Sequence, residues 1–209
     1  MHFVKGHLYH VYNQGNNRET IFYSRENYLV FLRKTHLHIA PRCHILAWCL
    51  MPNHFHFLIG ANDISTHVIK VGGNYMQTLA NGFRLLQVNY AQYFNSQQHR
   101  SGSLFRQKAK AKCLTEELLC TVDGTGVPEP FNAYPWVCFH YIHQNPCKAG
   151  LAQTPLDWEF SSCRDFSGQR NGHLCDVELA QTWLGLTAFD LEPKNAIHLE
   201  EARINKIFV

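Results

Sequence analysis

The chain has 209 residues, of which 45% are apolar and 13% aromatic, and its formal net charge is +3. This length and composition support one domain with an appendage, or at most two small domains. Charged residues make up only 17%, which excludes a disordered or coiled-coil chain. No run of eighteen apolar residues exists, so no membrane-spanning helix is expected. The N-terminus lacks the apolar stretch of a signal peptide, which predicts a cytoplasmic protein. Eight cysteines contain no CxxC pair, and we expect them to be reduced and mostly buried.

The first forty residues predict a strand followed by a helix. Residues 8–14 alternate and are rich in strand-forming residues. Residues 15–17, Gly-Asn-Asn, predict a loop. Ser24 is the expected N-cap of a helix over residues 25–40, where apolar residues recur at helical spacing. Pro41 ends that helix.

The next segment predicts a hairpin and a long helix. Residues 43–50 and 54–60 are expected to be two strands joined by a tight connection. Ser65 is a candidate N-cap for a helical stretch that runs to about residue 95, with a break near Gly72 and Gly73.

The second half of the chain is expected to supply one more strand and a helix behind a Gly/Pro-rich loop at 121–132. The strand is predicted at 104–114. The helix is predicted at 134–145 and ends near Asn145, because a residue before proline disfavours the α region. A further helix is expected near 176–184. The order β-α-β-β-α-β and then a helix predicts an α+β fold of the ferredoxin-like, split βαβ kind, with an antiparallel central sheet.

His54 and His56 form an HxH pair on a predicted strand. Side chains alternate along a strand, so the two imidazoles point to one face while Phe55 and Phe57 point to the other. Two neutral imidazoles on one face suit a catalytic ion, because they leave coordination positions open for substrate oxygens. The alternative is chance, since HxH is short and the chain contains 14 histidines.

Tyr141 and Asn145 stand four residues apart on a predicted helix and therefore share a face. A tyrosine hydroxyl can act as a covalent nucleophile, and a nearby amide oxygen can complete the coordination of an ion. The alternative is a half-buried tyrosine with its hydroxyl at the rim of the protein. Tyr134 is expected at the helix start. His140 and His143 are expected to point elsewhere, and their spacing with the neighbouring cysteines matches no closed zinc site.

A basic segment at 100–112 contains no acidic residue. If residues 104–114 form a strand, the basic side chains from 106 to 112 share one face and form a phosphate-binding stripe; the alternative is a solvated basic strand. Asn17 and Arg18 either contact DNA or only make the turn after the first strand. The DNA-contact candidates are Arg100, Arg106, Lys108, Lys110, Lys112, Asn17, Arg18 and Lys148.

Five segments in order resemble the single-tyrosine HUH transposases of insertion sequences, and among these the REP-associated tyrosine transposases in particular. The resemblance covers roughly residues 5–168, so we expect a transposase domain at 1–168 and a C-terminal extension of unknown role at 169–209. Two departures are Lys148, where relatives usually have arginine, and a longer stretch before the tyrosine helix. The segments are YHVYNQGNNRETIF at 9–22, LMPNHFHFLI at 50–59, YFNSQQHRSGSLFRQKAKA at 93–111, YIHQNPCKAGL at 141–151 and DWEFSSCRDF at 157–166.

The resemblance implies a ferredoxin-like domain whose HUH pair is His54 and His56, with Tyr141 as nucleophile and Asn145 as a further metal ligand. It implies Mg²⁺ or Mn²⁺ as cofactor. It also implies cleavage and rejoining of single-stranded DNA, often at hairpins, through a 5′-phosphotyrosine, by a monomer or a homodimer. Two alternatives are a hairpin-binding protein that is catalytically silent or domesticated, and a metal-binding hydrolase unrelated to DNA. The basic segment disfavours the hydrolase.

Overall fold

A computed structural model describes residues 1–115, 134–187 and 190. Its centre is a four-stranded sheet in the order β2-β3-β1-β6, in which all neighbours are antiparallel. The strands are β1 (Leu8–Gln14), β2 (His44–Met51), β3 (His54–Gly60) and β6 (Lys110–Cys113). The predictions of the first three strands are confirmed.

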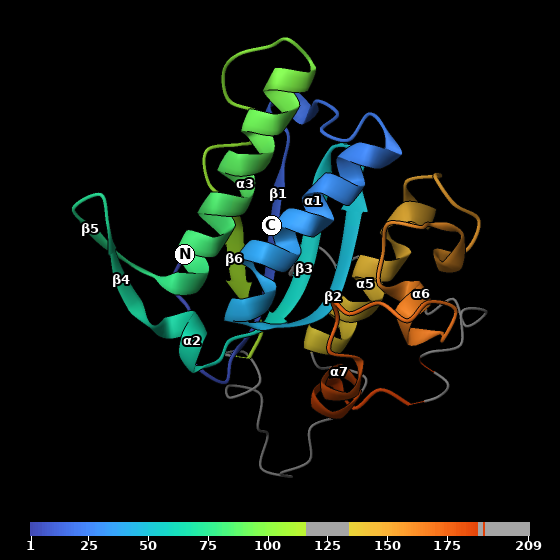
Figure 1. Cartoon of the computed structure of the whole chain (residues 1–209). Helices are drawn as coiled ribbons and strands as arrows, with labels where there is room; N and C mark the ends of the chain where they lie inside the picture. The colour runs from blue at the N-terminus through green and yellow to red at the C-terminus, as the bar shows by residue number, and fades with distance from the viewer. Residues whose placement is uncertain (116–133, 188–189, 191–209) are drawn as a thin grey trace.

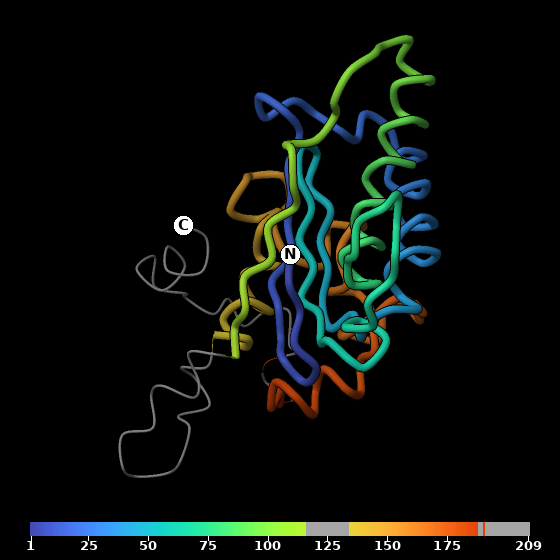
Figure 2. Tube along the Cα trace, turned by 90° about the vertical axis from the view of Figure 1, so that its left-hand side faces the viewer, coloured from blue at the N-terminus to red at the C-terminus, as the bar shows by residue number. Residues whose placement is uncertain are grey.

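Helices cover both faces of this sheet. Helices α1 (Arg25–His38) and α3 (Thr78–Gln97) lie side by side on one face, and α5 (Tyr134–Lys148) lies on the other (Figures 1 and 2). The chain order β1-α1-β2-β3-α3-β6 places β1 and β3 in the centre and β2 and β6 at the edges. This is the split βαβ arrangement, so the predicted α+β, ferredoxin-like fold is confirmed.

Alternation along β3 separates two environments. Phe55 packs on Phe31 of α1, with ring centroids 5.2 Å apart, and Phe57 packs on Phe83 of α3, with centroids 6.1 Å apart. These four rings are fully buried. Burial of such rings stabilises the fold by roughly 1.5–3 kcal/mol each. The even-numbered residues of β3 therefore face α5.

Helix α1 begins where the sequence predicts. The Ser24 side chain accepts a hydrogen bond from the Asn27 backbone N–H, and the Asn27 side chain accepts one from the Ser24 backbone. This capping box satisfies two N–H groups that the first helical turn would otherwise leave without partners. The cap fixes where α1 starts to cross the sheet.

The prediction of a long helix from Ser65 is wrong. The chain forms a short helix, α2 (Asp63–Thr66), and then a hairpin of β4 (Val68–Val71) and β5 (Asn74–Gln77) that projects from the body (Figure 1). Gly72 and Gly73 have φ of 54° and 87°. A two-residue hairpin loop of this hand needs positive φ at both positions, which glycine supplies without strain. The glycine pair is therefore a strand turn, and α3 starts only after it.

The strand predicted at 104–114 is shorter than expected, since β6 covers only Lys110–Cys113. Phe105 turns into the core and is 5% exposed, with its ring 6.0 Å from that of Phe55. Before β6, this segment is tied to the end of β1 by an isolated bridge between Gly15 and Phe105 and by bonds of Arg106 with Gln14 and Asn13. An apolar anchor at this point overrides the strand pattern, so Arg106 and Lys108 lie outside the strand.

Helix α5 runs past Asn145, where the sequence predicts its end. Pro146 lies inside its last turn, and the backbone N–H of Ala149 still bonds the carbonyl of Asn145 at 3.0 Å. The helix ends at Lys148, and Gly150 follows with a φ of 69°. The N–H groups of Gly150 and Leu151 bond the carbonyls of Cys147 and Pro146, which is a Schellman motif. This glycine cap decides the end of the helix, and the proline does not.

The segment after α5 returns to the edge strand β2. It contains η3 (Pro155–Asp157), α6 (Cys163–Phe166) and α7 (Val177–Leu184), and α7 confirms the helix expected near 176–184. Asp176 donates its backbone N–H to the carbonyl of Ile45, and the Trp183 ring packs on His44 of β2.

The boundary at residue 168 stays a prediction, and the loop at 121–132 lies outside the described residues. No helix in the described ranges is long and apolar enough to cross a membrane. Two other short elements are η1 (Asn16–Arg18) and η2 (Ala40–Arg42).

Candidate metal and tyrosine site

His54 and His56 point together from β3 toward the α5 side of the sheet, as the strand pattern predicts. Their ring centroids are 4.9 Å apart and nearly perpendicular. His56 is 4% exposed. Burial lowers the pKa of His54 to about 4 and that of His56 well below its usual value, so both imidazoles are neutral near pH 7. Neutral imidazole is the form that binds a metal ion.

Tyr141 lies against this pair. Its ring centroid is 5.7 Å from that of His56, and the two rings meet edge to face. Burial raises the pKa of the Tyr141 phenol, and a side-chain hydrogen bond with Asn145 opposes part of that shift. The expected shared face of Tyr141 and Asn145 is therefore present, and their helix faces the histidine strand.

Lys148 and Asn145 complete the surroundings of the tyrosine. The Lys148 Nζ lies 5.5 Å from the centroid of the Tyr141 ring, and the Lys148 side chain is exposed. This is a cation–π contact at the exposed end of the tyrosine's surroundings. Asn145 is 8% exposed, and its amide Nδ2 has no hydrogen-bond partner among the described residues. Nδ2 is a hydrogen-bond donor, so a cation at this residue would be held by the amide Oδ1.

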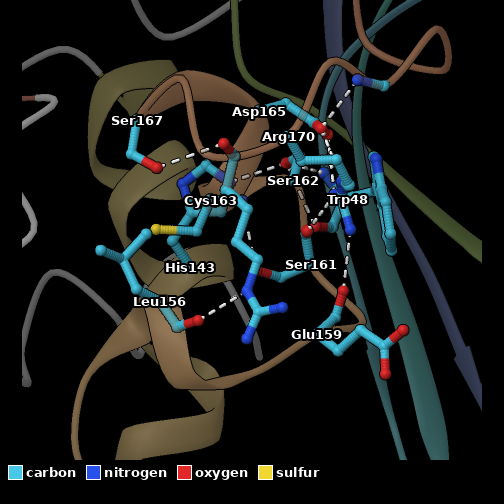
Figure 3. A network of polar contacts seen from close by, with 12 residues as sticks. Trp48, His143, Leu156, Glu159, Ser161, Ser162, Cys163, Asp165, Ser167 and Arg170 are labelled. Atoms are coloured by element: carbon cyan, nitrogen blue, oxygen red, sulfur yellow. Dashed lines mark hydrogen bonds and ion pairs between the residues drawn. The ribbon is translucent and has the colours of Figure 1, made fainter.

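A polar cluster fixes α5 to the edge strand (Figure 3). Ser162 Oγ accepts from the backbone N–H of Trp48 at 2.9 Å and lies 2.7 Å from Nε2 of His143 on α5. Arg170 bonds Asp165 at 2.6 and 2.8 Å and lies over the Trp48 ring, 5.2 Å from its centroid. Buried networks of this kind hold one arrangement. The network therefore sets where α5, and with it Tyr141, meets the sheet.

His140 and His143 point away from His56, as expected. Besides its contact with Ser162, His143 packs edge-on against Phe139, and His140 lies 3.7 Å from Asp190. Burial lowers the pKa of His143 to about 3 and that of His140 to about 4. Within the described ranges, no three histidine, cysteine or acidic side chains gather as a metal cluster.

Two residues of the site were missed by the sequence reasoning. His10 on β1 is fully buried, and its Nε2 lies 2.9 Å from Nδ1 of His56. Tyr12 lies directly across from His56 in the strand register, with ring centroids 6.0 Å apart. The signal was available, because even-numbered residues of β1 face the same side as His56 once β1 and β3 pair in this register.

The basic residues divide between two faces. Lys112 pairs with His10 and Lys110 with Tyr12 in the β1–β6 register, so both lysines lie on the face of the sheet that carries His54 and His56. Arg106 and Lys108 instead line a cavity of about 240 Å³ that Arg84 and Gln87 of α3 also line. The predicted stripe from 106 to 112 on one face is therefore wrong, because the strand begins only at Lys110.

The other DNA-contact candidates lie in the loops at one end of the sheet. Arg100 lies 3.5 Å from Glu19 in an ion pair and over the Phe94 ring. Asn17 and Arg18 are exposed and have φ of 52° and 60°. They form the turn after β1, and a DNA contact there stays a prediction.

The residues present fit a divalent cation in their chemistry. Two neutral imidazoles and an amide oxygen are nitrogen and oxygen donors, a set that fits Mn²⁺ better than Mg²⁺, because imidazole is a softer donor than the oxygens that Mg²⁺ prefers. Such a set leaves coordination positions open for substrate oxygens, unlike a closed structural zinc site.

Comparison with solved structures finds a similar chain. A solved structure described as a REP-associated tyrosine transposase bound to a REP hairpin is similar to 85% of this chain and 92% of its own, with 14% identity and a TM-score of 0.49. No family model matches the chain, and no curated protein matches its sequence. At this identity and TM-score the likeness decides nothing about function, which is argued below from the residues themselves.

Proposed function

We propose that this protein is a metal-dependent single-stranded DNA endonuclease and strand transferase that acts through Tyr141. The observation that carries the proposal is the contact of the Tyr141 ring with His56, 5.7 Å between centroids, with Asn145 hydrogen-bonded to the same tyrosine. A nucleophile beside two neutral imidazoles and an amide is a set suited to attack on a phosphodiester.

Tyr141 attacks the phosphorus atom of a DNA phosphodiester. A bond forms between the phenolic oxygen and phosphorus, and the bond to the 3′-oxygen breaks. The leaving 3′-oxygen takes up a proton, so the strand is released with a 3′-hydroxyl, while the phenol gives up its own proton. The product is a 5′-phosphotyrosine. Attack by a second 3′-hydroxyl reverses the step and joins strands, and no ATP is needed because the phosphodiester energy is retained.

His54, His56 and Asn145 would hold Mg²⁺ or Mn²⁺, which supplies a Lewis acid for the phosphoryl oxygen. The raised pKa of Tyr141 keeps the phenol protonated in the resting chain. The side-chain hydrogen bond with Asn145 opposes part of this rise in the pKa of Tyr141 and so favours the phenolate as it forms.

Lys110, Lys112 and Lys148 are the proposed phosphate contacts. All three surround the histidine face, so a strand bound to them passes the tyrosine. Lysine contacts of this kind position DNA without reading bases. We propose a hairpin with a single-stranded tail as the substrate, on the resemblance of the five sequence segments. Because Tyr141 meets His56 of its own chain, a single chain can supply the whole site.

Covalent capture tests the proposal. Wild-type protein, Mn²⁺ and an end-labelled hairpin with a single-stranded tail should give a protein–DNA adduct on a denaturing gel, and Tyr141→Phe should give none. Tyr12→Phe is the matched control, since Tyr12 also lies beside His56, with centroids 6.0 Å apart. It should still form the adduct.

Three outcomes would contradict the proposal. If Tyr141→Phe still forms the adduct, another tyrosine is the nucleophile, with Tyr12 and Tyr134 the first to test. Cleavage without any adduct would mean attack by water. Hairpin binding without cleavage would favour a silent DNA-binding protein.

A further inference from the structure

The two imidazoles of the candidate site are each held at Nδ1, by partners from two different segments. His54 Nδ1 lies 2.5 Å from the side-chain Oδ1 of Asn53. His56 Nδ1 lies 2.9 Å from Nε2 of His10. A histidine that binds metal through Nε2 must carry its proton on Nδ1, and the partner at Nδ1 decides whether it does.

The Asn53 amide has one orientation only. Its Nδ2 donates to the backbone carbonyl of Arg18 at 3.1 Å, so its Oδ1 faces His54. The flipped amide would set Oδ1 against the Arg18 carbonyl, two acceptors with no proton between them. An amide oxygen cannot donate, and His54 Nδ1 must therefore donate to it. The neutral His54 ring then has its lone pair at Nε2.

The backbone that presents the Arg18 carbonyl is unusual. Asn17 and Arg18 are consecutive non-glycine residues in the left-handed region, with φ of 52° and 60°. Each costs roughly 1–2 kcal/mol for an L-residue. The backbone N–H of Gly15 also bonds the carbonyl of Asn53 at 2.8 Å, which ties the two segments together. The Asn53 amide donates to the carbonyl that this turn presents.

His10 occupies the corresponding position for His56. It is fully buried on β1, one strand away from the ligand it contacts. Only one proton can lie between His10 Nε2 and His56 Nδ1, and it belongs to one ring or the other. If it belongs to His10, the neutral His56 carries its proton on Nε2 and cannot bind an ion there. If it belongs to His56, the Nε2 lone pair is presented.

We propose that Asn53 and His10 are positioning residues that fix His54 and His56 as Nδ1–H tautomers, so that both Nε2 lone pairs are presented to the divalent cation. The proposal rests on the metal site of the proposed function. It assigns His10 and the loop at 16–18 a role in that site, in addition to the role of Asn17 and Arg18 in the turn. Asn53 and His10 thus form an outer layer of polar partners around the metal site. Replacing such partners usually weakens metal binding ten- to hundredfold.

Long-range ¹H–¹⁵N correlation spectra of the metal-free, histidine-labelled protein report the tautomer of each ring. Wild type should show Nδ1–H for His54 and His56. Asn53→Ala should shift His54 alone toward Nε2–H, and His10→Met should shift His56 alone. His10→Gln should keep the wild-type pattern, because an amide oxygen can accept where His10 Nε2 does. An unchanged His143 signal shows that each variant is folded.

Manganese binding, followed by electron paramagnetic resonance, gives the second readout. Asn53→Ala and His10→Met should each weaken Mn²⁺ roughly ten- to hundredfold, and His10→Gln clearly less than His10→Met. Nε2–H tautomers in the wild type, or unchanged Mn²⁺ affinity in both weakening variants, would overturn the inference. Nδ1–H tautomers in a wild type that binds no Mn²⁺ would overturn the metal site of the proposed function and leave the tautomer assignment standing.

Discussion

The two faces of the central sheet are built by opposite rules from the same strands. Toward α1 and α3, β3 presents Phe55 and Phe57, which are buried among other aromatic rings. Toward α5, it presents His54 and His56, which are mostly buried among polar partners. One face is held by shape and apolar contact, and the other by donors and acceptors with fixed directions.

The two faces therefore differ in how well they tolerate substitution. An apolar face tolerates substitution as long as volume is kept. A buried polar face must satisfy each donor and acceptor, and one missing partner leaves a desolvated group. The face that carries His54 and His56 therefore depends on the polar partners behind them and behind α5, such as His10, Asn53 and Ser162.

The largest effect on stability should come from the apolar face. Phe57→Ala removes a fully buried ring that packs on Phe83, and should lower the free energy of unfolding by about 3–5 kcal/mol. Tyr141→Phe on the opposite face keeps its ring and should lower it by less than about 1 kcal/mol. Denaturant unfolding of both variants measures this. Equal losses would mean that the two faces do not differ in the way described.

Acid should act on the site face. Burial lowers the pKa of His10 to about 3 and that of His143 to about 3, so the folded chain keeps these rings neutral. The unfolded chain titrates them near 6.5, so it binds more protons below that pH and stability falls as pH falls. The loss continues until the folded pKa is reached. From pH 7 to pH 5 each ring should cost up to about 2 kcal/mol.

Unfolding in EDTA at both pH values checks this expectation. His10→Gln replaces one of these rings with an amide that does not titrate. It should reduce the loss of stability between pH 7 and pH 5 by the contribution of one ring, up to about 2 kcal/mol. If the variant loses as much stability between pH 7 and pH 5 as wild type, His10 does not remain neutral in the folded chain.

The sequence predicts most of the sheet and the two halves of the site, because both depend on local periodicity. The strand pattern places His54 with His56, and helical spacing places Tyr141 with Asn145. Their meeting across α5 and β3 depends on tertiary packing through Ser162, which periodicity does not encode. His10 was missed because it becomes visible only when the β1–β3 register is known. The errors at Gly72, at Phe105 and at Pro146 share one cause, which is that a turn, a core anchor or a helix cap overrode a local pattern.

Asn145→Ala should have an intermediate effect, because it removes an amide that is proposed as a ligand while leaving the nucleophile. We expect Mn²⁺ affinity to fall about tenfold, equivalent to roughly 1.4 kcal/mol, and cleavage to recover in part at high Mn²⁺. Gln144→Ala is the matched control, since it points about 100° around the same helix. Equal loss in both variants, or no recovery with Mn²⁺, would place the role of Asn145 in folding of α5.

The smallest expected effect concerns the lysines, and it decides which face DNA follows. Lys110 and Lys112 lie on the histidine side of the sheet, whereas Arg106 and Lys108 lie at the cavity that α3 lines. Each phosphate contact to a single strand contributes about 0.7 to the slope of log affinity against log salt. Replacing Lys110 and Lys112 by alanine should therefore flatten the slope by about 1.4. Replacing Arg106 and Lys108, which removes the same charge, should change the slope less.

Fluorescence anisotropy with a labelled hairpin and tail, measured over a salt series, gives both slopes. Equal flattening by the two pairs would mean that the strand crosses the sheet edge and contacts both faces. A larger effect of Arg106 and Lys108 would place the DNA on the α3 side, too far from Tyr141 for the proposed chemistry.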